Sequence, residues 1–193
     1  MFFGIVEGTG KIKKIEGNIF TISHPFRKKF NVGDSIACLG MCATVLESDE
    51  QKFAVEIMAE SRKRTVFGNA KVDEEVNLER PAKMEARNSG HFVTGHIDEV
   101  GEILERKKVD DYEYFKIKFS DKNAPLVVEK GSVAIDGISL TVVNCGKNWL
   151  SVAIISHTLK VTNFGKKEAS DQVNLEFDIL GKYILRAQEL AND

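Results

Sequence analysis

The hexapeptide GMCATV occupies residues 40–45, and a near copy, GISLTV, occupies residues 137–142. Each has a glycine, an apolar residue, a Cys or Ser, a second apolar residue and then Thr-Val. The chemical difference between them is a thiol at Cys42 and a hydroxyl at Ser139. Self-similarity at a fixed spacing is typical of a duplicated structural unit, so the same spacing of 97 residues should relate other segments of the chain.

Two further blocks repeat at this spacing. The segment 60–68 (ESRKRTVFG) matches HTLKVTNFG, and 75–79 (EVNLE) matches QVNLE. Near the start of each copy the spacing is 91, which relates GIVEGTGKI (4–12) to GHIDEVGEI. The second copy therefore has about six additional residues, which we place in the polar stretch ERKKVDDYEY (105–114).

Each copy has the pattern of a β domain. Short segments, rich in Val, Ile and Phe, mostly alternate apolar with polar residues, and Gly, Asn and Asp separate them. This predicts a small antiparallel barrel or sandwich in each copy, with the boundary within residues 86–94. We expect three parts: residues 1–90, 91–178 and 179–193. The expected strands include GNIFTIS (17–23), QKFAVEI (51–57), YFKIKF (114–119), GSVAI (131–135) and WLSVAII (149–155).

The last fifteen residues, 179–193, predict a helix that has no counterpart in the first copy. Its apolar residues recur at helical spacing, with charged residues opposite them. This apolar stripe packs on the barrels or meets copies of itself in a symmetric oligomer, and the pattern alone allows both. The stripe consists of Leu180, Tyr183, Ile184, Ala187 and Leu190.

The overall composition excludes some classes of function. A net charge of −2 with 29% charged residues gives no basic stripe for nucleic acid. There is no run of 18 apolar residues for a membrane span, and the start MFFGIVEG does not have the pattern of a signal peptide. Three cysteines, Cys38, Cys42 and Cys145, form no Cys-x-x-Cys pair, so we expect reduced thiols and a cytoplasmic protein.

Seven blocks of the chain, in order, resemble the riboflavin synthase alpha-chain family. The resemblance implies two tandem six-stranded antiparallel Greek-key barrels, related by pseudo-twofold symmetry, and a C-terminal helix that holds a homotrimer together. It also implies dismutation of two molecules of 6,7-dimethyl-8-ribityllumazine, in which a four-carbon unit passes from one to the other to give riboflavin and 5-amino-6-ribitylamino-uracil. No metal and no cofactor are implied. The blocks are MFFGIVEG, SIACLGMCATV, VNLER, GHFVTGHID, KGSVAIDGISLTV, HTLKVTNFG and VNLEFD.

A reaction between two identical molecules favours two copies of one binding site, because holding both reactants together removes their translational freedom. The two sites should share binding residues, and threonine hydroxyls suit this role because they both donate and accept hydrogen bonds. The glycines could instead serve tight turns only. The shared pairs are Thr44 with Thr141, Ser61 with Thr158, and Gly4 with Gly95. The resemblance implies a substrate-binding set of Gly4, Ile5, Val6, Ser35, Cys42, Ala43, Thr44, Glu56, Ile57, Met58, Ala59, Glu60, Ser61, Gly95, His96, Ile97, Lys130, Ser139, Leu140, Thr141, Ala153, Ile154, Ile155, Ser156, His157 and Thr158.

The two reactants have different roles, so the chemical groups of the two sites should differ. His96 suits proton transfer because imidazole titrates near neutrality, and Cys42 or Ser139 could act as a nucleophile. We expect these three residues and Asp178 to be catalytic, although Cys42 could also be only a small buried strand residue. Four ionisable residues have no repeat partner of the same type: His96 stands opposite Ile5, Lys130 opposite Gly33, His157 opposite Glu60, and Asp178 opposite Pro81.

The positions of the histidines support further expectations. His91 and His96 are five residues apart, so on a regular strand at most one of them reaches the site. A zinc site built from these two histidines with Cys38 and Cys42 is not expected, because the spacing matches no standard zinc pattern. We expect His24 at the surface.

The chain departs from the family at several positions. Where the family usually has Thr, Leu and Thr, this chain has Phe3, Ala43 and Ser61, all of which we expect in the site of the first copy. The alternative function is a non-catalytic protein that holds a lumazine or flavin as a fluorophore, which should have lost chemical residues from one site. Here Cys42 remains in the first copy and the blocks around Ser139 remain in the second, so the enzyme is favoured.

Overall fold

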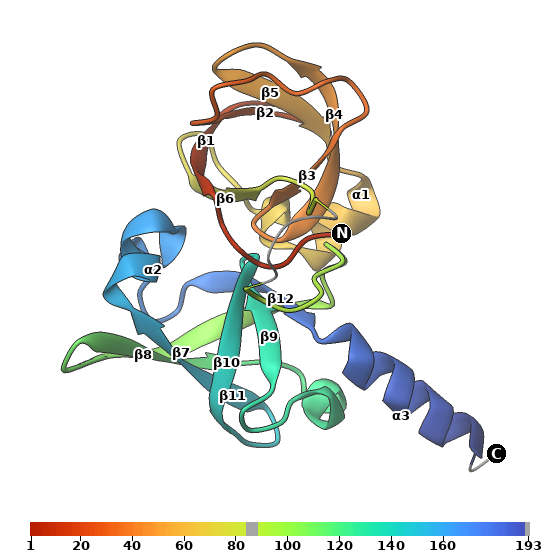
Figure 1. The fold of residues 1–193 in the computed structure, drawn as a ribbon, viewed down its shortest axis with the longest axis vertical. Helices are drawn as coiled ribbons and strands as arrows, with labels where there is room; N and C mark the ends of the chain where they lie inside the picture. Colours follow the sequence, from red (N-terminus) through yellow and green to blue (C-terminus); the bar gives the residue numbers. More distant parts are fainter. Residues whose placement is uncertain (84–88, 192–193) are drawn as a thin grey trace.

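The computed structural model describes residues 1–83 and 89–191. They form two closed six-stranded antiparallel barrels, one above the other in Figure 1, and helix α3 (Ile179–Ala191), which projects away from both. The prediction of an all-β chain of two tandem barrels with a terminal helix is confirmed. Residues 84–88, of which 86–88 belong to the expected boundary region, and the last two residues of the given sequence lie outside the described residues.

The first barrel has the strand order β1-β2-β5-β4-β3-β6. Strand β2 pairs with β5 and not with β3, which gives the barrel its Greek-key connection. Two short helices, α1 (Ala59–Arg64) and η1 (Val66–Gly68), lie between β5 and β6. The strands are β1 (Gly8–Glu16), β2 (Ile19–Ser23), β3 (Ser35–Cys38), β4 (Met41–Ser48), β5 (Lys52–Glu56) and β6 (Glu75–Glu79).

The second barrel repeats this order as β7-β8-β11-β10-β9-β12. Its longer β7–β8 hairpin has strands of 11 and 7 residues, against 9 and 5 residues in β1 and β2. Most of the additional residues of the second copy therefore lie where the sequence places them. The elements are β7 (Glu99–Val109), β8 (Tyr112–Lys118), η2 (Asp121–Leu126), β9 (Ser132–Ile135), β10 (Ile138–Cys145), β11 (Trp149–Ile155), α2 (Ser156–Val161), η3 (Asn163–Lys166) and β12 (Gln172–Phe177).

Each barrel has its own apolar core. The short helices, which the sequence pattern did not predict, contribute a phenylalanine to each of them. Phe67 of η1 packs edge-on against Phe20 with ring centroids 5.6 Å apart, and Phe164 of η3 packs against Phe115 at 5.1 Å. Both phenylalanines of the short helices are fully buried, so these helices belong to the folded barrels and not to surface loops.

The expectation that His24 lies at the surface is wrong. Its side chain is buried among three aromatic rings, those of Phe26, Phe30 and Phe53. Its Nε2 atom is 3.2 Å from the backbone oxygen of Asp49. Phe30 and Phe53 are 6 and 29 residues from His24 in the sequence, so these rings come together only when the barrel closes.

The two barrels meet at the β3–β4 and β9–β10 turns. Gly40 and Gly137 occupy these turns with φ of +81° and +79°, and each is so close to the other that an added Cβ would lie 2.7 Å from a backbone nitrogen. The approach and the left-handed backbone both require glycine here. These two glycines mark the pseudo-twofold axis between the barrels.

A buried polar network crosses this axis with the same symmetry. Asn77 Nδ2 donates to the backbone oxygen of Asp136 at 3.0 Å, and Asn174 Nδ2 donates to that of Leu39 at 2.9 Å. These four residues form two pairs at the repeat spacing of 97 residues. The barrels are therefore joined by reciprocal hydrogen bonds between equivalent residues.

Candidate active site

Two short segments exchange between the barrels, and we call them straps. Strap 1 is residues 3–6, which lead into β1, and strap 2 is residues 94–97, which lead into β7. The backbone oxygen of Gly4 in strap 1 accepts a hydrogen bond from the Ser139 amide at 2.8 Å, and Val6 packs against the core of the second barrel. Strap 1 therefore lies on the barrel to which it does not belong.

Strap 2 makes the reciprocal contacts. The backbone oxygen of Gly95 accepts a hydrogen bond from the Cys42 amide at 2.9 Å, and Ile97 packs against the core of the first barrel. Phe2 and Val93, just before the straps, pair as an isolated antiparallel bridge. Each copy of the repeated hexapeptide thus lies against the strap of the other copy.

The strap glycines are required by this close packing. Gly4 and Gly95 have φ of +72° and +85°. An added Cβ on Gly95 would lie 2.4 Å from the Cβ of Cys42, and one on Gly4 would lie 2.7 Å from the Cβ of Ser139. Contacts this short do not occur between real Cβ atoms, so a side chain here would displace the strap from the hexapeptide.

The exchange divides the predicted residues into two sites. In the first site, β4 carries half-buried Cys42, buried Ala43 and exposed Thr44, and Ser35 of β3 stands opposite Thr44 in register. The segment Glu56–Ser61 runs from the end of β5 into α1; Ile57 is buried in the core, whereas Met58, Ala59 and Glu60 are exposed and Ser61 is half-buried. From strap 2 come buried Gly95, exposed His96 and half-buried Ile97.

The second site is built in the same way around β10. Ser139 and Leu140 are half-buried, and Thr141 is exposed. Lys130, exposed with φ of +63°, lies before β9, and its amide donates to the Val142 oxygen at 2.8 Å. The other members are Gly4 (buried), Ile5 (exposed) and Val6 (half-buried) of strap 1, and Ala153, Ile154, Ile155, Ser156, His157 and Thr158 at the junction of β11 and α2, where Ile154 is buried, Thr158 half-buried and the rest exposed.

Ser132 was missed from the predicted set. It stands opposite Thr141 in the β9–β10 register, as Ser35 stands opposite Thr44 in the first barrel. Both sites therefore have a serine and a threonine on adjacent strands. The repeat spacing of 97 residues, which relates Ser35 to Ser132, could have identified it.

Phe3 was expected in the site of the first copy. It lines a cavity together with Ser35 of that site, and its amide donates to Glu79 of the first barrel at 2.8 Å. Its ring is also 6.2 Å from that of Phe92. Phe3 therefore contacts the first barrel, although strap 1 continues from it onto the second.

His91 is a second residue that the sequence reasoning missed. Its Nδ1 atom lies 2.7 Å from the hydroxyl oxygen of Ser139. Burial lowers the pKa of His91, and the nearby Asp178 carboxylate opposes this by favouring the charged imidazole. A neutral imidazole next to a serine hydroxyl can accept the proton of that hydroxyl, so the second site contains a serine–histidine pair.

The argument that only one of His91 and His96 reaches a site assumed a regular strand. Neither histidine lies in one, since both precede β7. His91 contacts Ser139 of the second site, and His96 follows Gly95, which contacts Cys42 of the first site. The period of two residues does not apply to such a segment.

Some of the predicted residues line cavities. Ile5 and Ser35 line a cavity of about 560 Å³ that also touches Phe3 and Glu79. Asp178, half-buried after β12, lines a separate cavity of about 350 Å³ at the start of α3. Its carboxylate accepts a hydrogen bond from the Leu180 amide at 3.0 Å, which fixes it at the N-terminal end of the helix.

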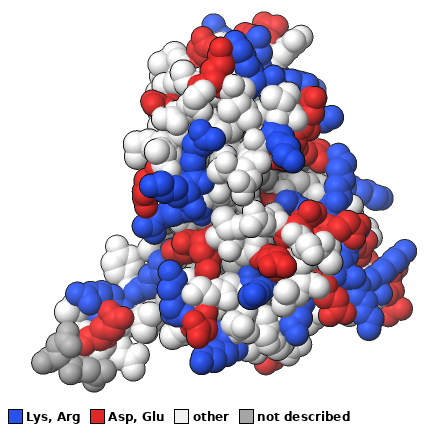
Figure 2. All heavy atoms as spheres, turned by 180° about the vertical axis from the view of Figure 1, so that it is seen from behind, with Lys and Arg blue, Asp and Glu red and all other residues white. Residues whose placement is uncertain are grey.

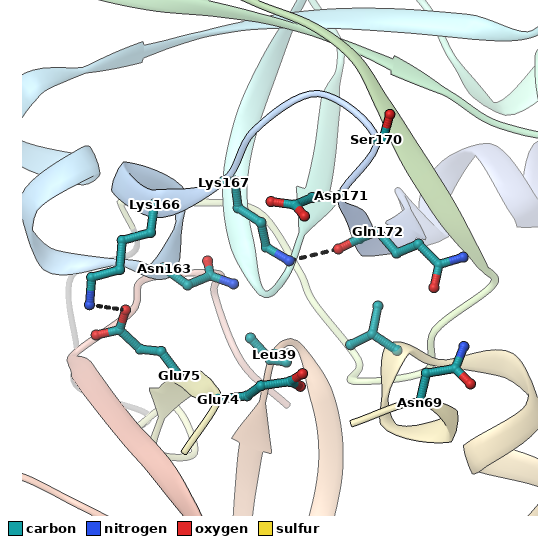
Figure 3. Close-up of a pocket in the computed structure, with 11 residues that line it drawn as sticks. Leu39, Asn69, Glu74, Glu75, Asn163, Lys166, Lys167, Ser170, Asp171 and Gln172 are labelled. Atoms are coloured by element: carbon teal, nitrogen blue, oxygen red, sulfur yellow. Dashed lines mark hydrogen bonds and ion pairs between the residues drawn. The ribbon is translucent and has the colours of Figure 1, made fainter. Parts of the chain in front are cut away.

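A third cavity, of about 370 Å³, lies between the barrels next to the axis (Figure 3). Two lysines point into it, but each ammonium group has a partner. Lys166 Nζ is 2.8 Å from a carboxylate oxygen of Glu75, and Lys167 Nζ is 2.7 Å from the backbone oxygen of Gln172. We therefore assign no ligand to this cavity.

The surface and the titratable residues do not indicate other classes of site. On the face seen in Figure 2, basic and acidic residues are mixed and no field of one sign covers it. In the part of the chain that the structure describes, His, Cys, Asp and Glu form no group of three suited to a metal ion. Within the same residues, no helix is long and apolar enough to cross a membrane.

The chain matches the model of the lumazine binding domain twice, over residues 3–81 and 94–178. It is 43% identical over 189 residues to riboflavin synthase of Actinobacillus pleuropneumoniae, an alignment that covers 95% of this chain and 88% of the relative. It is 37% identical over 196 residues to riboflavin synthase of Brucella abortus, with 96% and 97% covered. The chain belongs to the riboflavin synthase family.

A solved structure agrees with this assignment in fold. The crystal structure of LumP complexed with 6,7-dimethyl-8-(1'-D-ribityl) lumazine has a TM-score of 0.82 to this chain. The match covers 92% of this chain and 99% of that chain at 24% sequence identity. The duplicated barrel of the riboflavin synthase family is thus also the fold of LumP.

Proposed function

We propose that the protein catalyses the dismutation of two molecules of 6,7-dimethyl-8-ribityllumazine to riboflavin and 5-amino-6-ribitylamino-uracil. One observation carries the proposal. The chain has two sites of one design, each made from a hexapeptide and a strap, with different reactive groups at equivalent positions: the Cys42 thiol in one and the Ser139 hydroxyl in the other. Two like sites with unlike chemistry suit two identical molecules with unlike roles.

The residues shared by the two sites are suited to hold the ring and its substituents. Thr44 and Thr141 have exposed side chains on β4 and β10, and a hydroxyl can donate to or accept from a pyrimidine edge. Met58 and Ile155, equivalent at the spacing of 97 residues, are exposed apolar side chains that can cover a flat ring. We assign binding to these residues and to the straps.

The chemical step needs proton transfer at the methyl group on C7 of one lumazine. The Ser139–His91 pair can accept such a proton, because burial holds the pKa of His91 below its usual value and the imidazole is neutral at pH 7. Asp178, near His91, stabilises the imidazolium that then forms. His96, next to the first site, is the second candidate for proton transfer.

The other lumazine must be made ready to give up its four carbons. Addition of a nucleophile to its C7 atom does this, and the half-buried Cys42 thiol is placed in the first site for that role. The carbons that one molecule loses are those the other gains, so there is no net oxidation. The reaction as written needs neither a metal nor a redox cofactor.

The test is incubation of the purified protein with the lumazine and measurement of riboflavin fluorescence and of the diaminouracil product. Riboflavin and the uracil in equal amounts are expected. Lumazine that binds and stays unchanged would instead identify a fluorophore-binding protein, and no binding at all would remove both functions.

We also propose that the protein is a homotrimer held together by α3, with each active site formed between the first site of one chain and the second site of its neighbour. The exposed side chains of α3 support this, since Tyr183 and Ile184 are 72% and 69% exposed in the single chain. Deletion of residues 180–193 should give monomers with much reduced turnover. A truncated protein that sediments as a trimer would overturn the proposal.

We place the protein in the cytoplasm. The described cysteines, Cys38, Cys42 and Cys145, are all free thiols, which suits a reducing compartment. Fractionation of the producing cells, with antibody detection of the protein, tests this placement.

A further inference from the structure

Two buried glutamates hold the straps, and neither belongs to the predicted set of site residues. Glu79 at the end of β6 is 6% exposed, and Glu176 in β12 is 2% exposed. They are equivalent at the repeat spacing of 97 residues. A buried carboxylate is costly unless it is well hydrogen-bonded, so the partners of these two residues are informative.

The partners are successive backbone amides of the straps. Glu79 accepts hydrogen bonds from the amides of Phe3 at 2.8 Å and Gly4 at 3.0 Å. Glu176 accepts hydrogen bonds from the amides of Thr94 at 2.6 Å and Gly95 at 2.9 Å. In each case the carboxylate spans the two amides that precede the turn of the strap at a left-handed glycine.

These bonds continue directly into the reactive residues of the opposite barrel. Gly4, held through its amide by Glu79, accepts through its carbonyl from the amide of Ser139. Gly95, held by Glu176, accepts in the same way from the amide of Cys42. A glutamate of one barrel is therefore linked, through one strap glycine, to the reactive residue of the other barrel.

We propose that Glu79 and Glu176 are positioning residues for the two sites, each setting the place of the strap that completes the site of the other barrel: Glu176 acts on the Cys42 site, and Glu79 acts on the Ser139 site. The assignment of these sites to lumazine rests on the proposed function. The crossed pattern of control rests only on the hydrogen bonds.

The two glutamates differ in the kind of donor that reaches them. Thr94 adds a third hydrogen bond to Glu176 through its hydroxyl, at 2.7 Å, whereas the equivalent residue of strap 1, at the spacing of 91, is Phe3, which has no hydroxyl. Strap 2 is held by two backbone amides and a side-chain hydroxyl, whereas strap 1 is held by the backbone amides of Phe3, Gly4 and Ile5 alone.

The experiment uses thiol reactivity as a measure of strap opening. In a Cys145→Ser background, Cys42 reports on the first site, since Cys38 is fully buried and burial raises its pKa, which makes it unreactive. A second background, with Cys42→Ser, Ser139→Cys and Cys145→Ser, places the reporting thiol in the second site. The probe is an aromatic disulfide that releases a coloured thiolate.

Glu176→Gln should speed modification of Cys42 and leave the thiol introduced by Ser139→Cys within twofold of its parent. Glu79→Gln should do the reverse. The side-chain amide of Gln accepts hydrogen bonds through its oxygen only, so one backbone amide of the strap loses its partner. The open state of the strap then becomes about fivefold more populated, which is the factor for one hydrogen bond of about 1 kcal/mol.

The matched controls are Glu75→Gln, on the same strand as Glu79, and Glu99→Gln in the second barrel. Glu75 accepts from the Thr9 hydroxyl and from Lys166, and Glu99 accepts from the Ser120 amide and Asn123. Neither touches a strap, so neither thiol should change its rate. If Glu176→Gln fails to fold, Thr94→Val takes its place as the test. This variant keeps both buried glutamates and should speed Cys42 modification.

Rates that rise equally at both thiols with either glutamine, or that do not change, would overturn the crossed control. Turnover of the lumazine by the same variants is a separate measurement. An unmodified protein that makes no riboflavin would remove the proposed function, whereas the thiol rates would still decide the positioning roles.

Discussion

The two sites have the same backbone arrangement and differ most in the ionisable residues that lie next to it. In the second barrel the Ser139 hydroxyl has an imidazole partner, His91, and the turn before it carries the buried carboxylate of Asp136. In the first barrel the equivalent residues of the hexapeptide and its turn are Cys42, which packs near an apolar cluster, and Leu39, which is itself in the core. Duplication preserved the geometry, while the ionisable groups were concentrated in the second copy.

Asn163 and Lys167, two of the residues that support the carboxylate of Asp136, have no equivalent of the same type in the first barrel. This carboxylate accepts from Asn163 Nδ2 at 2.7 Å and from the Asn174 amide at 2.8 Å, and Lys167 Nζ lies 3.9 Å away. At the spacing of 97 residues, Val66 stands for Asn163 and Ala70 for Lys167. The first barrel could therefore not accept a charge at the same place.

This asymmetry gives the largest expected effect. Leu39→Asp should lower the free energy of unfolding by about 3–5 kcal/mol, the usual cost of a buried charge without a partner. Asp136→Leu should cost less, about 1–3 kcal/mol, because it leaves only the donors of Asn163 and Asn174 unsatisfied. Urea unfolding of both variants measures this, and a larger loss for Asp136→Leu would contradict the comparison.

The chemical groups give the next effect. Asp178→Asn, His96→Ala and His91→Ala should each lower turnover by roughly ten- to a thousandfold, the range for a lost acid–base group, with little change in ligand affinity. Steady-state kinetics and fluorescence titration of the lumazine measure the two quantities.

The matched comparison is with the shared binding residues. Thr44→Ala and Thr141→Ala should mainly weaken binding, by about 1 kcal/mol for a neutral hydrogen bond. If the threonine variants lose turnover, and the histidine and aspartate variants keep it, the roles are assigned wrongly.

The buried carboxylates also predict a dependence of stability on pH. Burial raises the pKa of Glu79 to about 7, against the opposing hydrogen bonds from the strap amides, and burial raises the pKa of Asp136. Between the unfolded pKa of 4.5 and about 7, folded Glu79 therefore holds a proton that the unfolded chain has lost, so stability falls as pH rises through this window. The slope contributed by one proton is at most about 1.4 kcal/mol per pH unit.

Urea unfolding at several pH values from 4.5 to 8 measures this slope. Glu79→Gln should flatten it, because an amide does not titrate, and Glu75→Gln on the same strand should leave it unchanged. A slope that is the same in all three proteins would show that Glu79 does not titrate in this window.

The smallest effect would make the two straps alike. Phe3→Thr should supply a side-chain donor to Glu79, as Thr94 does for Glu176. The thiol introduced by Ser139→Cys should then react a few-fold more slowly, in proportion to one hydrogen bond of about 1 kcal/mol. Phe3→Val is the control, because Val has a shape similar to that of Thr and no hydroxyl. An equal change in both variants would assign the effect to the lost phenylalanine ring.

The sequence predicted what depends on local pattern. Period-two segments located strands in both barrels, and helical spacing predicted the start of α3 at Ile179. The constant spacings of 91 and 97 residues showed which residues are equivalent, such as Cys42 and Ser139. Equivalence follows from the sequence alone because both copies obey the same local rules.

What the sequence could not give is which equivalent residues meet. Spacing relates Gly4 to Gly95, but it does not say that each lies on the other barrel, because the exchange is decided by packing between the copies. His91 was missed for a related reason, since it lies outside any strand and reaches Ser139 only through the path of the chain before strap 2. Short helices such as α1 have too few residues for a periodic signal.

The exchange of straps also has a consequence during synthesis on the ribosome. The first barrel can close as soon as β6 has emerged, because its strands are consecutive in the chain. The Cys42 site must still wait for Gly95, 16 residues after the end of β6, and for Glu176, in the last strand of the second barrel. The Ser139 site waits for the whole of β10, although strap 1 is made first. A nascent chain therefore carries a folded barrel long before it carries a finished site.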